Sequence, residues 1–325
     1  MDFFQCPSCG GHLFFHNLSC ACGTEVAYDP EARRFQSLSA VVPCANRPQI
    51  GCNWKASEDG LCRSCSTTRT RPDLSVAGNL RLWAGAEQAK RRVFYDLMHW
   101  GLFTPSDRFE APIFDLLAEE TRHGETPVTM GHADGVITIN VEEADAAERE
   151  ARRLVLGEPF RTMVGHFRHE IGHLVFERLK GRSSFLGQFR DLFGDERTDY
   201  AAALERHYDR KPPEGWQRNH LSAYATAHPH EDWAESFAHF LHLTALIAAA
   251  QSAGVTSPAL VDAGETFDVY LANSAEPFLT IGADLSIALN HMTRAVGLPD
   301  PYPFVLTSRT REKLAFVQIW LRHAA

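Results

Sequence analysis

The chain has 325 residues, of which 44% are hydrophobic and 22% are charged, and its formal net charge is −9. This composition is typical of a globular protein with a sizeable core, and it excludes a disordered chain, a collagen-like repeat and a coiled coil. The sequence contains no apolar run of membrane-spanning length, and its N-terminus lacks a basic stretch followed by an apolar one. We therefore expect a cytoplasmic protein without membrane association.

The cysteines divide the chain. All eight lie between Cys6 and Cys65, in two C-x2-C pairs, one C-x-C pair and one looser pair. Such clustering without a secretion signal favours metal binding over disulfides. The simplest division follows chain order and gives two four-cysteine zinc sites, Cys6, Cys9, Cys20 and Cys22 followed by Cys44, Cys52, Cys62 and Cys65, although an interleaved division is also open.

Both cysteine sites are expected to be structural, because a zinc ion with four cysteine ligands has no open coordination position. Residues 1–75, which we interpret as a zinc-ribbon domain, are too few to bury a large core without metal. This segment carries 7 basic and 7 acidic residues. Its neutrality argues against a nucleic-acid partner and favours another protein or the chain's own second domain as the partner of the ribbon.

The predicted elements follow in chain order. The first 70 residues are interpreted as short strands and turns, and the polar segment 66–74 as a linker to a second domain over residues 76–325. Apolar spacing predicts helices, and one alternating segment, 127–141, predicts two short strands around Ala133, Asp134 and Gly135. The helices are expected at 79–101, 113–121, 145–156, 159–180, 196–208, 231–250, 281–296 and 309–323. The predicted fold is therefore mainly α, an α+β zincin-like domain with a short sheet, preceded by the ribbon.

The most informative motif lies in FRHEIGHLVFERLK (167–180), which contains His169, Glu170 and His173 in an HExxH arrangement. Residues i and i+4 share one face of a helix, so both imidazoles can bind one Zn²⁺. Glu170 lies beside them and can take a proton from a zinc-activated water and pass it to a leaving amine. The apolar residues around the motif indicate a buried helix rather than a surface helix with scattered histidines.

A catalytic zinc also requires a third protein ligand and an open position for water. Phe176 and Leu179 stand where a metzincin has its glycine and third histidine. A gluzincin instead takes a glutamate from a later helix, and the segment 228–243 offers one. We assign Glu231 to the metal and Glu235 to a hydrogen bond with the outer nitrogen of a ligating histidine. Glu235 and His239 remain alternative ligands.

A group that stabilises the oxyanion is also expected in a hydrolase. Tyr224 lies seven residues before Glu231, and its hydroxyl could face the zinc. His228 and His230 are other candidates for this role, and a buried loop aromatic is the alternative for Tyr224.

Two further segments have a functional and a structural interpretation. Residues 136–140, with Ile137 and Ile139, are either an edge strand that binds extended substrate or an ordinary core strand. The segment FGDERTDY (193–200) favours a helix start with Asp195 as its cap, although its acids could also line the cleft or bind a second cation.

Taken together, the cysteine ribbon, HEIGH, FGDERTDYAAALERHY (193–208) and SAYATAHPHEDWAESFAHFLH (222–242) resemble zinc-dependent bacterial metallopeptidases with an N-terminal zinc ribbon. The resemblance extends over essentially the whole chain, including GLPDPYPFVL (297–306). The Tyr-x6-Glu-x3-Glu block is also similar to the catalytic domain of anthrax lethal factor and its relatives. That similarity implies that Tyr224 supports the transition state and that Glu231 binds zinc.

We therefore expect a gluzincin-type zinc metallopeptidase that acts on a peptide or protein substrate, with one catalytic and two structural Zn²⁺ ions. Glu170 would be its general base. The alternative is a zinc-stabilised regulatory protein that binds a protein or nucleic acid and has a purely structural HExxH site. Hydrolysis of a non-peptide amide is a further alternative, because the same chemistry would allow it.

Overall fold

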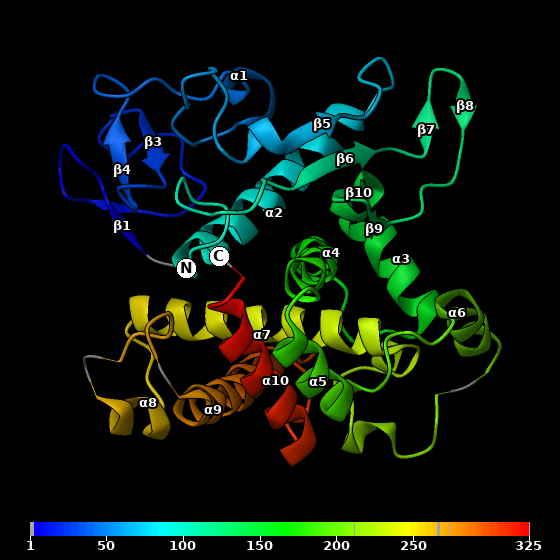
Figure 1. Cartoon of the computed structure of the whole chain (residues 1–325). Helices are drawn as coiled ribbons and strands as arrows, with labels where there is room; N and C mark the ends of the chain where they lie inside the picture. The colour runs from blue at the N-terminus through cyan, green and yellow to red at the C-terminus, as the bar shows by residue number, and fades with distance from the viewer. Residues whose placement is uncertain (1–2, 211, 265–266, 273, 325) are drawn as a thin grey trace. The chain divides into compact units, whose positions relative to one another are not determined.

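The computed structural model describes residues 3–210, 212–264, 267–272 and 274–324. The chain divides into two compact units, one formed by residues 1–156 and 161–167 and the other by residues 157–160 and 168–325. Helices predominate, and every strand among the described residues belongs to the first unit (Figure 1). The expected fold class, a mainly helical chain with small sheets after a cysteine-rich segment, is confirmed.

The N-terminal part of the first unit consists of two antiparallel hairpins and a long helix that completes their core. Strands β1 (Phe4–Gln5) and β2 (His12–Leu13) pair with each other, as do β3 (Val26–Asp29) and β4 (Arg34–Ser37), and α1 (Arg47–Ile50) follows. Helix α2 (Asn79–His99) places the Tyr95 ring 5.1 Å from Phe15 and 5.8 Å from Tyr28. The aromatic core of the ribbon therefore includes a residue of α2.

A four-stranded sheet forms the rest of the first unit's core, in the order β5-β6-β10-β9. Its strands are β5 (Thr68–Thr70), β6 (Ile113–Leu117), β10 (Val136–Asn140) and β9 (Gly131–Ala133). The pairings of β6 with β5 and with β10 are parallel, whereas β9 and β10 form an antiparallel hairpin. The remaining elements of this unit are the hairpin of β7 (Glu120–Thr121) and β8 (Gly124–Glu125), two short 3-10 turns, η1 (Cys65–Thr67) and η2 (Val141–Ala144), and helix α3 (Ala146–Leu156).

Two of the expected elements differ from the structure. The segment 113–121, predicted as a helix, contains β6, in which Phe114 and Leu116 are buried at alternate positions. A short apolar run fits a buried strand and a helix equally well, which explains the error. The segment 66–74, predicted as a linker, contains β5, and Thr68 pairs with Phe114 of β6. This segment is part of the sheet rather than a tether.

The expectation of an exposed substrate-binding edge at residues 136–140 is also wrong. Strand β10 pairs with β6 on one side and, over Val136–Thr138, with β9 on the other, so it is an inner strand. The side chains of Ile137 and Ile139 are fully buried in the core. These two residues therefore pack the sheet and are not available to an added peptide strand.

The second unit is built around helix α7 (Pro229–Ser252), which contacts α5 (Ser183–Phe193), α9 (Ala275–Ala295) and α10 (Ser308–Leu321) (Figure 1). Its other elements are α4 (Met163–Leu179), which begins in the first unit, α6 (Tyr200–Asp209), α8 (Pro258–Ala263), and the 3-10 turns η3 (Trp216–Arg218) and η4 (Tyr224–Thr226). Phe185, on the unpredicted helix α5, lies 5.6 Å from the Trp233 ring of α7 and 5.2 Å from the Trp320 ring of α10. This aromatic cluster fixes the first turns of α7.

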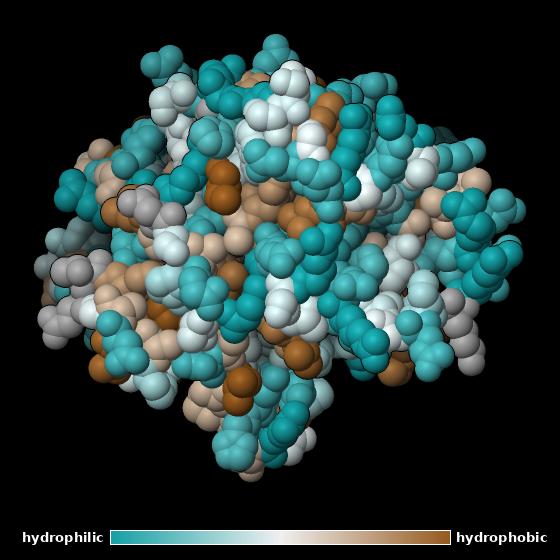
Figure 2. Space-filling view, turned by 60° about the horizontal axis from the view of Figure 1, so that its bottom comes forward, coloured by the Kyte–Doolittle hydropathy of each residue, from teal (hydrophilic) through white to brown (hydrophobic). Residues whose placement is uncertain are grey.

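Exposed hydrophobic residues on the face in Figure 2 are separated by hydrophilic ones, and they form small groups rather than one broad patch. Among the described residues, no helix combines the length and the apolar content needed to cross a membrane.

A buried ion cluster in the first unit holds the beginning of α4. Glu143, in η2, is fully buried, and its carboxylate accepts hydrogen bonds from Arg161 at 2.7 Å and from the His166 Nε2 at 3.1 Å. Burial would raise the pKa of Glu143, but the bonds from His166 and Arg161 outweigh it and lower the pKa to about 2. The folded unit therefore requires this carboxylate in its charged form.

Removing that charge should destabilise the protein. We expect Glu143→Gln to lower the free energy of unfolding at pH 7 by about 3 kcal/mol, because Arg161 and His166 lose the buried carboxylate charge that accepts their hydrogen bonds. Urea denaturation of the zinc-loaded protein measures this change. The difference from the wild type should shrink as the pH falls from the ordinary value of 4.5 towards 2, because the wild-type carboxylate also becomes neutral there.

Glu150→Gln is the matched control, because Glu150 makes an i,i+3 ion pair with Arg153 on α3 and is mostly exposed. Its substitution should change the free energy of unfolding far less, because solvent screens an exposed ion pair. Equal effects of the two substitutions would show that the buried cluster contributes no more than a surface pair.

Candidate metal centre

The site depends on a close approach between α4 and α7. Gly172, inside the HExxH motif, faces α7 so closely that a Cβ atom there would lie 3.1 Å from the Ala234 Cα and 3.2 Å from the Phe237 Cβ. The indole of Trp233 donates a hydrogen bond of 2.8 Å to the Gly172 carbonyl oxygen. The two helices are therefore in contact at the turn that carries the histidines.

Three potential metal-ligand atoms from α4 and α7 lie close together. The Nε2 atoms of His169 and His173 are 3.2 Å apart, and Glu231 places one carboxylate oxygen 3.0 Å from the first and the other 3.5 Å from the second. Bonds of about 2.0–2.1 Å to one tetrahedral Zn²⁺ would separate neighbouring ligand atoms by about 3.4 Å. The spacing and the imidazole–carboxylate donor set therefore fit one zinc ion.

The other two ligand candidates lie outside this group of three. Glu235 Oε1 accepts a hydrogen bond of 2.8 Å from the His169 Nδ1, on the far side of the ring from the three converging atoms. Such a bond fixes the tautomer and leaves the lone pair of Nε2 for a metal. His239 directs its Nδ1 to the Tyr302 hydroxyl at 3.0 Å.

Tyr200 joins the site, although the sequence analysis did not single it out. Its hydroxyl donates a hydrogen bond of 2.6 Å to Glu231 Oε1. Tyr200 is the first residue of α6, and Asp199 caps this helix by accepting from the Ala202 amide, so the expected cap at Asp195 is wrong. Asp195 instead pairs with Arg197. The acid-rich segment marks a helix start, but no local spacing reveals a bond to a residue 31 positions later.

The charges of the site are mutually balanced. Burial would raise the pKa of Glu231, but hydrogen bonds from His169 and His173 outweigh it and hold the pKa well below its usual range. Burial likewise acts to lower the pKa of His169, but the bonds to Glu231 and Glu235 raise it. Glu231 is therefore present as a carboxylate, the form that binds a cation.

Glu170, which follows His169 on α4, has a carboxylate that the described residues leave partly unpaired. Only 7% of this residue is exposed, and its Oε2 is buried without a hydrogen-bond partner among those residues. Buried carboxylate oxygens normally accept a hydrogen bond. The unpaired oxygen is suited to accept one from a water or substrate in the site.

Two of the three oxyanion candidates have structural contacts of their own. His228 caps α7 by accepting from the His230 amide, and the His230 ring lies 4.6 Å from Phe176. Tyr224, in η4, lies with its ring 5.9 Å from that of His169. Burial raises the pKa of Tyr224, and burial with the Glu231 charge raises that of Tyr200, so both phenols remain protonated donors.

The cysteines form two groups in chain order, each with its sulfurs within 4.8 Å of one another. Sulfur pairs are 3.7 and 3.8 Å apart in the first group and 3.6 and 3.8 Å apart in the second, and all eight thiols are free of disulfides. Four Zn–S bonds of about 2.3 Å would set the sulfurs about 3.8 Å apart. Both groups fit a tetrahedral zinc ion.

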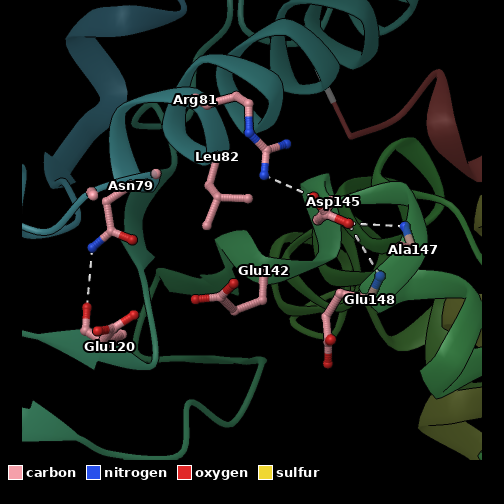
Figure 3. Close-up of a pocket in the computed structure, with 10 residues that line it drawn as sticks. Asn79, Arg81, Leu82, Glu120, Glu142, Asp145, Ala147 and Glu148 are labelled. Atoms are coloured by element: carbon pink, nitrogen blue, oxygen red, sulfur yellow. Dashed lines mark hydrogen bonds and ion pairs between the residues drawn. The ribbon is translucent and has the colours of Figure 1, made fainter.

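The first unit also has a shallow hollow of about 420 Å³, formed where α2 and α3 begin (Figure 3). Its polar side chains hold the chain in place, since Arg81 pairs with Asp145 at 2.8 Å and Asn79 donates to the Glu120 carbonyl at 3.0 Å. Asp145 also accepts from the Ala147 amide. These bonds connect the starts of α2 and α3 to neighbouring segments. None of the three converging ligand residues lines the hollow.

Comparison with known proteins identifies related sequences. Residues 79–320 match the family described as putative zinc-binding metallo-peptidase, and residues 3–76 match a zinc-ribbon domain. Uncharacterized proteins of Mycobacterium tuberculosis and Mycobacterium bovis are 40% identical to the chain over 328 residues, covering 98% of it and 94% of each relative. No solved structure matches the chain.

Filling the contact at Gly172 should disturb the site. We expect Gly172→Ala to lower the free energy of unfolding by about 1–3 kcal/mol, because the added methyl forces α4 away from the α7 backbone. Thermal unfolding and zinc content per chain measure the two effects. Gly187→Ala on α5 is the matched control, because a Cβ atom there meets nothing within 4 Å. A Gly172→Ala protein as stable and as zinc-rich as this control would contradict the tight contact.

Loss of the Tyr200 hydroxyl should weaken metal binding. We expect Tyr200→Phe to reduce the zinc affinity of the site about 10-fold or more, because Glu231 loses the donor that orients its carboxylate. Competition with a chromophoric chelator measures this affinity. Tyr208→Phe, on the largely exposed part of the same helix, is the control and should bind zinc like the wild type. Unchanged affinity in Tyr200→Phe would show that its bond does not support the ligand.

Proposed function

Because this chain belongs to the family of zinc-binding metallo-peptidases, we propose that it hydrolyses peptide bonds as a gluzincin, with His169, His173 and Glu231 as ligands of a catalytic zinc. The observation that carries this proposal is the convergence of three ligand atoms, combined with a buried, unpaired oxygen on Glu170, the residue that follows His169 on α4. A purely structural metal site would not need an unpaired carboxylate beside it.

Zinc bound there would polarise the scissile carbonyl and lower the pKa of a water molecule in its open position. The chain's own residues do the rest. Glu170 accepts a proton from the attacking water and returns it to the leaving amine, so one carboxylate acts first as base and then as acid. Its buried oxygen has no competing partner among the described residues that would have to be displaced first.

The tyrosines have separate roles in this proposal. Tyr224 donates a hydrogen bond to the developing oxyanion, because its phenol remains protonated and its ring lies close to His169. Tyr200 and Glu235 orient the ligands Glu231 and His169 through their hydrogen bonds. Neither Tyr200 nor Glu235 needs to touch the substrate.

The two cysteine groups hold structural zinc ions in the same proposal, which gives three ions per chain. Free thiols in two tetrahedral groups suit the reducing cytoplasm, where we place the protein. The substrate is a peptide or protein, and the neutral ribbon is a candidate surface for a protein partner.

Substitution of the base tests the activity. We expect Glu170→Gln to retain zinc in the site but to lose hydrolysis by 100-fold or more, because the amide cannot accept the proton. Incubation with a cellular peptide mixture, followed by mass spectrometry of new termini, compares the variant with the wild type. Glu177→Gln, on the same helix and ion-paired with Lys180, is the control and should cleave normally. Full cleavage by Glu170→Gln would refute the proposed mechanism, and no cleavage by the wild type would favour a regulatory protein with a structural HExxH site.

A further inference from the structure

The two cysteine groups differ in their surroundings. In the first group Cys9 and Cys22 are exposed, and backbone amides of Ser8 and Gly11 point at sulfurs. All four cysteines of the second group are buried, and the Cys65 sulfur lies 3.9 Å from the Glu87 carboxylate of α2. The second group is therefore enclosed by a helix from outside the ribbon match.

The side of α2 that faces the second cysteine group carries three buried charged residues. Glu87 and Lys90 are fully buried and pair at 3.2 Å, and the Thr68 hydroxyl donates to the same Glu87 oxygen at 2.5 Å. Glu87 and Lys90 therefore balance each other. Arg91, with 2% of its surface exposed, adds a positive charge to this pair.

The guanidinium of Arg91 lacks a conventional partner. Its Nε and Nη1 atoms are buried without a hydrogen-bond partner among the described residues. Arg91 lies one helical turn after Glu87, whose carboxylate is 3.9 Å from the Cys65 sulfur, so both side chains lie on the side of α2 toward the second cysteine group. Burial acts to lower the pKa of Arg91, but the negative charges of Cys52, Glu87, Cys65 and Cys62 raise it. A buried guanidinium with two unpaired nitrogen atoms is costly, and negative charge on the neighbouring cysteines would offset that cost.

The protonation state of the cysteines decides this balance. Four neutral thiols, or two disulfides, would leave the group of Glu87, Lys90 and Arg91 with a net charge of one positive unit. Four thiolates around Zn²⁺ carry two negative units, which offset the guanidinium. Outer partners of this kind typically affect metal affinity 10–100-fold.

We propose that Arg91 is a positioning residue for a zinc ion in the second cysteine group, and that its buried positive charge ties helix α2 to that metal. Arg91 and Glu87 lie within residues 79–320, which match the peptidase family, whereas the cysteines lie within residues 3–76, which match the ribbon. The ribbon zinc thus holds the first helix of the peptidase segment. This inference does not depend on hydrolytic activity.

The experiment uses the full-length zinc-loaded protein and compares Arg91→Gln with Arg81→Gln, an exposed position on the same helix. A chelator and a thiol-alkylating reagent are added together, and peptide mass spectrometry gives the alkylation rate of each cysteine. The first cysteine group is the internal control. Hydrogen exchange of the amides in α2 is the second measurement.

In Arg91→Gln we expect the four cysteines of the second group to be alkylated about 10–100-fold faster, with faster exchange in α2 and an unchanged first group. Arg81→Gln should behave like the wild type. Wild-type rates for the second group in Arg91→Gln would overturn the proposal. So would fewer than eight free thiols in the denatured, metal-stripped wild type, because disulfides would then occupy the groups.

If Arg91→Gln disturbs folding in general, the cysteines of both groups will be alkylated faster. A second pair of variants distinguishes this outcome from a specific effect of the charge. Arg91→Lys keeps the charge and Arg91→Met keeps much of the apolar length. The proposal requires slower alkylation of the second group in Arg91→Lys than in Arg91→Met. Equal protection in these two variants would show that Arg91 contributes packing and not charge.

Discussion

The contact between α4 and α7 at Gly172 is the constraint on which the metal centre depends. One helix supplies the two imidazoles and the other supplies Glu231, so the donor atoms meet only if the backbones approach within the distance that a glycine permits. The close packing of the two helices is stabilised by the hydrogen bond from the Trp233 indole to the Gly172 carbonyl oxygen and by the aromatic cluster of α5, α7 and α10. The hydrophobic core of the second unit therefore sets the positions of its most polar atoms.

The donor sets divide the chain chemically. Nitrogen and oxygen ligands meet next to a carboxylate that the described residues leave partly unpaired, which is an arrangement prepared to receive another molecule. Sulfur ligands meet in two four-cysteine groups, where backbone amides point at the thiols. In the proposed function the first arrangement holds a zinc ion for chemistry and the second holds zinc ions for stability.

The sequence predicts the structure best where a hydrophobic period extends over many residues or where one helix imposes the spacing of two residues. The long helices, the hairpin of β9 and β10, and the shared helix of His169 and His173 follow from such local patterns, whereas Glu231 on α7 was assigned from the ligand set of gluzincins. Strand β6 was mistaken for a helix because five apolar-rich residues fit both periods. Tyr200 was missed because its partner lies far away in the chain, and a tyrosine at a helix start has no distinctive local signature.

The packing of Tyr95 into the ribbon core has a consequence for how such a protein can change over evolutionary time. A ribbon usually counts as a module that can be gained, lost or replaced at its boundary. Here that boundary, between residues 76 and 79, falls before the helix that completes the ribbon's aromatic core. A lineage that exchanged residues 3–76 for an unrelated ribbon would keep an α2 whose Tyr95 is positioned to pack into the original ribbon core. Ribbon and helix are therefore expected to be inherited together with the rest of the first unit, because β5 pairs with β6 and this unit extends to residue 156.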